Sequence, residues 1–148
     1  AIRDVTHDRF QALTRVGSGY SEKTLDEINQ KIVRVDPQRP LRNVDYPKGF
    51  SGVYVDPTFV MEVAAADLQE SKAFPACQHL TQSGKGISAR FATFQRFRDD
   101  KGPEECTSAI QVHEFFLGQA TRVAANDEPE EQNAATDNEE SEESIESE

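Results

Sequence analysis

Residues 85–101 read KGISARFATFQRFRDDK, and this stretch does most to indicate the fold. It holds five cationic side chains, three phenylalanines and two adjacent aspartates. The alternation of residue types predicts one β-strand, whose cationic face carries Arg90, Phe94, Arg96 and Arg98. Arginine makes planar, bidentate contacts with phosphate oxygens, so such a strand points to a polyphosphate or nucleic-acid ligand. The alternative is a solvated edge strand whose charges prevent aggregation.

The charge of the chain is unevenly distributed along its length. The formal net charge is -11, but residues 126–148 contain eleven acidic residues and no lysine or arginine. All 16 cations therefore lie in residues 1–125, which hold the other 16 of the 27 acidic residues. The acidic segment 126–148 carries one large apolar side chain, Ile145. It cannot bury enough apolar surface to offset its ordering entropy, so we expect a disordered acidic tail.

The remaining 125 residues suit one domain with a modest core. No apolar run approaches the ~20 residues that a membrane helix needs, so we expect no membrane partner. Cys77 and Cys106 form no CxxC pair, and the three histidines complete no zinc-spaced cluster. We therefore expect no metal site, and a reducing intracellular compartment.

Short strands and turns are predicted before the cationic stretch. Gly17-Ser18-Gly19 predicts a tight turn. Residues 53–55 and 59–63 predict two strands around an Asp56-Pro57 turn, and residues 83–86 predict another turn. Several short strands with Gly-bearing turns favour a small β-barrel over an α/β sandwich.

Two helices are predicted at the periphery. Ser21 is a typical N-cap for the first, whose apolar stripe predicts core packing and consists of Leu25, Ile28 and Ile32. Ser108 caps the second, which is expected to run to about residue 118.

No motif supports catalysis by this chain alone. It has no Walker loop, no GxSxG elbow and no His-x-x-x-His pattern. Residues 98–101 fit an R-x-D-K pattern, in which Arg98 and Lys101 reach a pyrophosphate and Asp100 orients them. The alternative is a solvated charge run.

Five blocks occur in order along the chain: RVGSGYS (15–21), DPTFVMEV (56–63), ADL (66–68), KGISARF (85–91) and RFRDDK (96–101). Together they resemble the C-terminal OB-fold domain of an ATP-dependent DNA ligase, nearest the eukaryotic replicative ligase I type. The resemblance covers roughly residues 8–120. It implies a mainly β fold: a small Greek-key OB barrel over residues 1–125 with short peripheral helices, followed by the disordered tail.

The resemblance also implies an activity. In this family a lysine of a preceding adenylation domain takes AMP from ATP, passes it to the 5′-phosphate of a nick, and the 3′-hydroxyl then seals the strand. The lysine-x-aspartate-glycine motif is absent here, so this chain alone is expected to be inactive. The implied cofactors are ATP and Mg²⁺, the latter held mainly outside this chain. The implied partners are nicked duplex DNA, the adenylation domain and a sliding clamp or repair adaptor, in the nucleus or mitochondrion.

The same resemblance implies two sets of site residues, used in two poses of the domain. In the closed pose, the ATP-binding residues are Arg96, Arg98 and Lys101, and the catalytic residues are Arg98, Asp100 and Lys101. In the DNA-bound pose, the contacts come from Arg15, Gly17, Ser18, Gly19, Lys85, Arg90 and Phe91. Phe91 corresponds to an aromatic residue that presses into the minor groove. Thr93 and Ala64 stand where the family usually has cations, which weakens phosphate contacts.

Other interpretations remain open at this stage. A capping guanylyltransferase or RNA ligase shares the R-x-D-K ending, but should lack the Gly17 turn and the blocks at 62–63 and 67–68. A stand-alone OB module would use exposed aromatics to stack single-stranded bases, and this chain has no tryptophan. Phe91 as a core residue, and Gly17 with Gly19 as a plain hairpin turn, are the structural alternatives.

Overall fold

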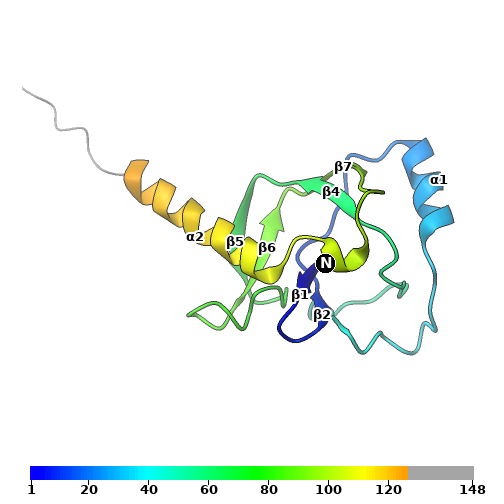
Figure 1. Cartoon of the computed structure of the whole chain (residues 1–148), viewed down its shortest axis with the longest axis horizontal. Coiled ribbons are helices and arrows are strands. Elements are labelled where there is room, and N and C mark those ends of the chain that lie inside the picture. The colour runs from blue at the N-terminus through cyan, green and yellow to red at the C-terminus, as the bar shows by residue number, and fades with distance from the viewer. Residues whose placement is uncertain (127–148) are drawn as a thin grey trace, which may run out of the picture.

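The computed structural model describes residues 1–126, so residues 127–148 of the predicted acidic tail lie outside the described part. Its first sheet contains β1 (Ile2–Asp4), β2 (Arg9–Gln11) and β3 (Val44–Asp45). β1 pairs antiparallel with β2, and β2 pairs parallel with β3 (Figure 1). The tight turn between β1 and β2 places Asp8 in the left-handed region, with φ 53°.

The rest of the sheet structure is one long ribbon with a bend. β4 (Met61–Ala64) pairs antiparallel with β7 (Thr93–Phe97), and β5 (Asp67–Ser71) pairs antiparallel with β6 (Gly86–Arg90). Ala64 faces Thr93 and Asp67 faces Arg90, so both pairs share one continuous register. The bend therefore lies at residues 65–66 on one side and 91–92 on the other.

This bend corrects the prediction of a single cationic strand through residues 90–98. Phe91 has φ 53°, a left-handed conformation that breaks the extended backbone. The stretch is consequently two strands, β6 and β7, separated by Phe91 and Ala92. A period-two pattern cannot reveal such a bend, because one left-handed residue leaves the alternation of residue types unchanged.

The predicted strand faces are also wrong at one position. The register of β4 against β7 shifts by one residue between Glu62 and Val63, which is a β-bulge. This extra residue turns both Phe94 and Phe97 toward the interior, where their ring centroids lie 5.1 Å apart. Phe94 is thus a buried core residue and does not share the cationic face.

The turn at 17–19 lies against β7. The carbonyl oxygen of Ser18 accepts a hydrogen bond from the Phe94 amide at 2.9 Å. Gly19 has φ 92°, and a Cβ placed there would lie 2.3 Å from the Phe94 carbonyl oxygen. Glycine is therefore required at position 19 by both its conformation and the close approach of β7.

The two α-helices begin where the sequence predicted. Helix α1 (Glu22–Lys31) is capped by Ser21, whose hydroxyl accepts from the Thr24 amide at 3.1 Å. However, α1 has no buried residue, and Leu25 is 48% exposed, so the predicted core packing is wrong. In Figure 1, α1 lies at one edge of the molecule, away from β5 and β6.

Helix α2 (Ala109–Asn126) extends beyond the predicted end at residue 118. Ser108 and Gln111 form a reciprocal capping box, with distances of 3.2 and 2.9 Å. The Gln119 amide both donates to and accepts from the backbone of Leu68, which covers part of the β5 edge. A short 3-10 helix, η1 (Pro103–Glu105), precedes α2.

The predicted strand at 53–55 does not form a ladder. Val55 makes one isolated bridge with Arg34, and the following strand begins at Met61. Instead, Tyr54 packs with Tyr46 and Phe50 in an aromatic cluster, with centroid distances of 5.1 to 5.6 Å. The segment is thus held by this bridge, by two backbone hydrogen bonds to Val33 and Val35, and by the aromatic cluster.

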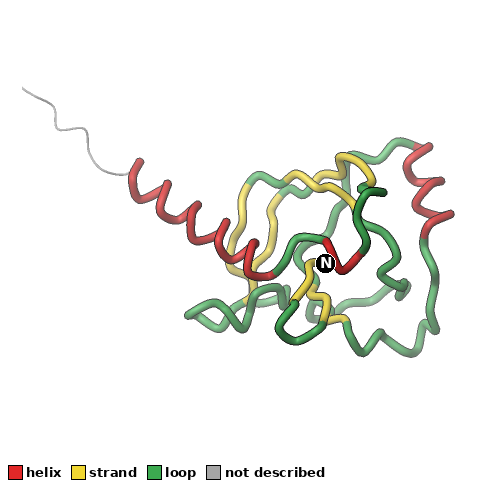
Figure 2. Tube along the Cα trace, in the orientation of Figure 1, coloured by secondary structure: helices red, strands yellow, loops and turns green. Residues whose placement is uncertain are grey.

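The core lies between the first sheet, the ribbon and the start of α2. Its buried members are Ile2, Ala76, Cys77, Ile87, Ala109 and Val112. Figure 2 shows short strands linked by long loops, with α1 and the far end of α2 at the periphery. The small, mainly β, OB-like fold is therefore confirmed. In the described part, no helix has both the length and the hydrophobicity that crossing a membrane requires.

Candidate functional site

The R-x-D-K residues lie just after β7, where carboxylates hold the Arg98 guanidinium. Its Nε and Nη2 each donate to the Asp100 carboxylate at 2.9 Å, and its Nη1 donates to Glu62 Oε2 at 3.4 Å. The hydrogen bonds from Arg98 lower the pKa of Asp100 to about 2, and those to Asp100 raise the pKa of Arg98 further. Both groups are therefore ionised across the physiological pH range.

Glu62 joins a second arginine to this cluster. Its Oε2 also accepts from Arg96 Nε at 3.0 Å, because the bulged register of β4 and β7 places these two residues opposite each other. One carboxylate therefore fixes the positions of both Arg96 and Arg98. Opposite charges that face each other across strands are a usual stabilising pair.

Lys101 differs from the two arginines. Its backbone amide closes a turn by donating to the Arg98 carbonyl at 3.2 Å, and its side chain is exposed. Within residues 1–126 the Lys101 side chain has no hydrogen bond or ion pair. Among the cations of this cluster, Lys101 can therefore bind a new anionic ligand without first breaking an ion pair with a carboxylate.

Helix α1 supports the same loop. Lys31 Nζ pairs with Asp99 Oδ1 at 3.2 Å and lies 4.9 Å from the centroid of the Phe97 ring. The predicted ATP-facing residues Arg96, Arg98, Asp100 and Lys101 are thus brought together. They share the end of β7 with a helix whose own apolar stripe is half-exposed.

A second group of predicted residues gathers at the bend of the ribbon. Phe91 is 78% exposed, so the interpretation as a core phenylalanine is wrong. The Arg90 guanidinium lies 5.4 Å from the centroid of the Phe91 ring and pairs with Asp67 at 2.5 and 2.7 Å. The hydrogen bonds between Arg90 and Asp67 lower the pKa of the carboxyl group and raise that of the guanidinium.

The Gly17-Ser18-Gly19 turn lies beside this bend. Ser18 Oγ lies 3.2 Å from Thr93 Oγ1, and Tyr20 stacks on Phe94 with centroids 5.2 Å apart. Nothing lies within 4 Å of the position that a Cβ of Gly17 would take. Unlike Gly19, Gly17 is not required by packing and leaves the backbone open to solvent.

Arg15 belongs to the same surface. Its neighbour Thr14 donates a hydrogen bond to the Ala89 carbonyl at 2.8 Å, which places residues 14–15 beside the end of β6. Arg15 is exposed, as is Arg90. The structure therefore gathers six of the seven predicted DNA-binding residues around the bend.

Lys85 is the exception. It precedes β6, whereas Arg90 ends it, and a five-residue strand is about 14 Å long. Lys85 instead borders an open pocket of about 720 Å³, together with Asp4, His7 and His79. Those three residues lie together in space, although the spacing of cysteines and histidines in the sequence predicted no metal site.

Several partner residues could not be identified from the sequence. Glu62 and Asp67 stand out as carboxylates only once the register pairs them with Arg96 and Arg90. The one available signal was the charge complementarity of these segments. The bulge shifts the pairing by one residue, so no fixed spacing would have found both pairs.

Known proteins resemble this chain over most of its length. A family model described as the C-terminal region of ATP-dependent DNA ligases matches residues 1–101, and its match ends at Lys101. A DNA ligase of Hyperthermus butylicus is 32% identical over 130 residues, covering 87% of this chain and 21% of that protein. A DNA ligase of Saccharolobus islandicus is 31% identical over 113 residues, covering 74% of this chain and 18% of that protein. The chain thus spans about a fifth of these relatives.

Proposed function

This chain belongs to the family of ATP-dependent DNA ligase C-terminal regions, and we propose that it is the OB-like part of a larger enzyme that seals nicks in duplex DNA. In this proposal the domain acts in two poses. One pose closes the end of β7 over ATP in the adenylation domain, and the other presents the bend of the ribbon to DNA.

One observation carries the proposal: the cations form two separate groups at opposite ends of β7. Arg96, Arg98 and Lys101 lie at its carboxyl end, and Arg90 with Phe91 lies before its start. The two groups lie at opposite ends of this five-residue strand, which is about 14 Å long. One ligand on one face of the domain would contact only one of these groups. A domain that rotates between two partners can use one group for each partner.

The group at the end of β7 suits the triphosphate of ATP. Two arginines are held in place beforehand, and Lys101 is exposed, so little reorganisation is needed when anionic charge develops on pyrophosphate. Asp100 is engaged by Arg98 through both carboxylate oxygens. It is therefore a poor ligand for Mg²⁺, which supports an Mg²⁺ site held mainly by other parts of the enzyme.

The bend of the ribbon suits the minor groove of a nicked duplex. Phe91 projects as an exposed apolar group between cations, as wedge residues of minor-groove binders do. Arg15 and the accessible backbone at Gly17 supply phosphate contacts that set the register on the duplex. Asp67 holds Arg90 beside Phe91, so the phosphate contact of Arg90 depends on that pairing being shared or broken.

Two variants of the complete enzyme test the two-pose proposal. We expect Lys101→Ala to slow self-adenylylation by about 100-fold, because a cation facing the leaving group is lost. We expect Phe91→Ala to leave self-adenylylation unchanged and to impair sealing. The matched controls are Lys23→Ala on α1 and Phe115→Ala on α2, which remove an exposed lysine and an exposed phenylalanine elsewhere. The reverse division of effects would refute the two-pose proposal.

Finer assignments are also part of this proposal. The order of the five sequence blocks supports an enzyme of the eukaryotic replicative ligase I type, acting in the nucleus or in mitochondria. Recruitment by a sliding clamp or a repair adaptor follows from the same resemblance. The relatives reported above are archaeal ligases, so imaging of the tagged complete enzyme is the direct test of its location.

A further inference from the structure

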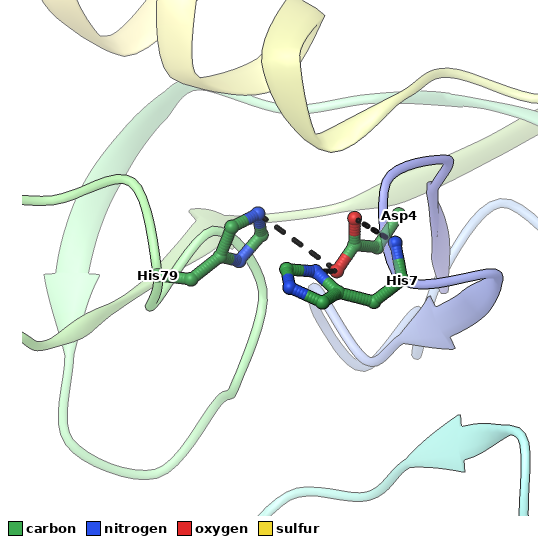
Figure 3. Close-up of side chains that lie close together, drawn as sticks. All are labelled: Asp4, His7 and His79. Atoms are coloured by element: carbon green, nitrogen blue, oxygen red, sulfur yellow. Dashed lines mark hydrogen bonds and ion pairs between the residues drawn. The ribbon is translucent and has the colours of Figure 1, made fainter.

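Asp4, His7 and His79 converge on one point beside the β1–β2 turn. Asp4 ends β1, His7 lies in the turn that follows, and His79 comes from the loop between β5 and β6 (Figure 3). Asp4 Oδ2 lies 2.7 Å from His7 Nδ1 and 3.8 Å from His79 Nε2. One ligand atom from each residue lies within 4.8 Å of the other two.

The carboxylate at the centre of this cluster is buried. The Asp4 side chain is 3% exposed, whereas those of His7 and His79 are 53% and 29% exposed. A buried carboxylate requires cationic or hydrogen-bonding partners. Arg3, the adjacent cation, instead pairs with Asp8 and covers the Phe10 ring. Arg9, whose charge also acts on Asp4, pairs with Asp45, so the two imidazoles are the side chains closest to the Asp4 carboxylate.

The hydrogen bonds at Asp4 also fix its orientation. Oδ1 accepts from the backbone amide of His7 at 3.3 Å, which leaves Oδ2 facing both imidazole rings. The carboxylate is therefore aimed at both imidazoles, as a metal ligand must be.

We propose that Asp4, His7 and His79 form a binding site for a divalent transition metal ion, of which Zn²⁺ is the natural example. Zinc takes imidazole nitrogens and carboxylate oxygens at about 2.0–2.2 Å, so its ligand atoms lie about 3.3 Å apart. The nitrogen of His79 must move closer to both other ligand atoms, by about 0.5 Å toward Asp4 Oδ2, and its loop position and partial exposure allow this. The open pocket beside the cluster leaves room for a water ligand.

The chemistry of the surroundings favours a transition metal over Mg²⁺ or Ca²⁺. Hard cations prefer sets of oxygen ligands, and this cluster offers two nitrogens and one carboxylate. The pocket rim also carries Lys48, Lys72 and Lys85. Their charges oppose an ion held by electrostatic attraction alone, whereas coordination by imidazole nitrogen provides the stronger, directional bond.

Such a metal would add a direct link between two segments that a hydrogen bond from the Cys77 amide to Gln11 Oε1 already connects nearby. His7 belongs to the N-terminal turn, and His79 belongs to the loop that leads into β6. A metal bound to the folded state alone stabilises it by mass action. At a hundredfold excess over its dissociation constant, Zn²⁺ should raise the Tm of this chain by about 10 °C.

The test uses the full 148-residue chain without an affinity tag. Zn²⁺ is titrated calorimetrically, and Co²⁺ is added separately as a spectroscopic probe of nitrogen coordination. We expect one site per chain with a dissociation constant in about the micromolar range, a Tm increase and a Co²⁺ absorption band. The absence of one-to-one binding, or of the Co²⁺ band, would overturn the proposal.

Variants distinguish Zn²⁺ binding at this site from weak Zn²⁺ binding by the many acidic residues of the chain. His79→Ala should weaken Zn²⁺ binding at least tenfold and abolish the Tm increase, while His113→Ala on α2 should change neither. His79 lies in a loop, so its replacement should preserve the fold, which circular dichroism would verify. His7→Ala is a second, independent variant with the same expected loss. Equal Zn²⁺ binding by the His79→Ala and His113→Ala chains would contradict the site.

Discussion

The arginines near the end of β7 are positioned by carboxylates before any ligand binds. Glu62 accepts from both Arg96 and Arg98, and Asp100 takes two further hydrogen bonds from Arg98. These pairs are exposed or half-exposed, so each contributes little to stability. Their larger effect is to hold the guanidinium groups in one orientation, and Glu62 is accordingly a positioning residue.

Glu62→Gln tests that role. The amide keeps the size of the side chain but loses the charge that attracts both arginines, so we expect self-adenylylation of the complete enzyme to slow by about tenfold. The free energy of unfolding should change by less than about 1 kcal/mol, because the pairs are solvent-exposed. Single-turnover adenylylation measures the rate, with Glu104→Gln on η1 as control. If both variants react at the wild-type rate, Glu62 does not position the arginines.

The lowered pKa of Asp100 implies a specific dependence of the stability of the fold on pH. Its folded-state pKa is about 2, below its ordinary value of 3.8. A carboxyl group with a lowered pKa stabilises the fold above its unfolded pKa and loses this contribution as the pH falls through its folded pKa. The Tm difference between wild type and Asp100→Asn should therefore be constant from pH 5 to 7 and vanish between about pH 4 and pH 2.

Thermal melts of this chain and of Asp100→Asn at these pH values provide the measurement. Asp4 and Asp67 also have lowered pKa values, so both proteins will lose stability in acid. The difference between the two proteins isolates Asp100. A difference that persists unchanged at pH 2 would contradict the ion pair with Arg98.

At the scale of elements, the sequence predicted the first residues of helices and the positions of turns better than the geometry of strands. Ser21 and Ser108 cap helices as expected, because capping depends on local hydrogen bonds. The bend at Phe91 escaped prediction, since phenylalanine is not a typical turn-forming residue, yet Phe91 adopts a left-handed backbone. The bulge also escaped prediction, because it depends on the register of β7 with β4.

The candidate site was predictable to a similar degree. The R-x-D-K residues are consecutive, and local chemistry indicated them, whereas the bend residues come from 15–19 and 90–91 and were predicted through the family resemblance. Asp67 and Glu62 became recognisable only through cross-strand pairing. The cluster of Asp4, His7 and His79 joins segments about 70 residues apart, and no spacing rule for zinc ligands anticipates it. Contacts between distant segments are the part of the site that requires the structure.

The contrast between Gly17 and Gly19 gives an element-scale prediction. Gly19→Ala would place a methyl group 2.3 Å from the Phe94 carbonyl at φ 92°, and we expect it to destabilise the chain by more than about 2 kcal/mol. Gly17→Ala meets no atom within 4 Å, so its effect should stay below about 1 kcal/mol. Urea denaturation of both variants measures these values, and equal destabilisation would contradict the packing of the turn against β7.

At the scale of the whole molecule, the chain covers only part of the relatives reported above. It spans about a fifth of its relatives, and α1 has no buried residue within the described part. Lys31, at the end of α1, still reaches the R-x-D-K loop. The formally neutral domain and the acidic segment 126–148 meet at the end of the described residues.

The acidic segment predicts a whole-molecule effect on DNA binding. Its eleven carboxylates compete with DNA phosphates for the cations of the domain, so deleting residues 126–148 should tighten binding of nicked duplex at low salt. The gain should shrink as salt is raised, because screening weakens the competition. Fluorescence anisotropy with a labelled nicked duplex measures it. Unchanged affinity at low salt would show that the segment does not compete.

The two-pose account is tested most directly by sealing of a nick whose 5′-phosphate already carries AMP. This substrate bypasses self-adenylylation and requires only the DNA-bound pose. The account predicts that the Lys101→Ala enzyme seals it at close to the wild-type rate, whereas the Phe91→Ala enzyme seals it at least about tenfold more slowly. Equal impairment of both variants on this substrate would contradict the separation of an ATP-facing group from a DNA-facing group.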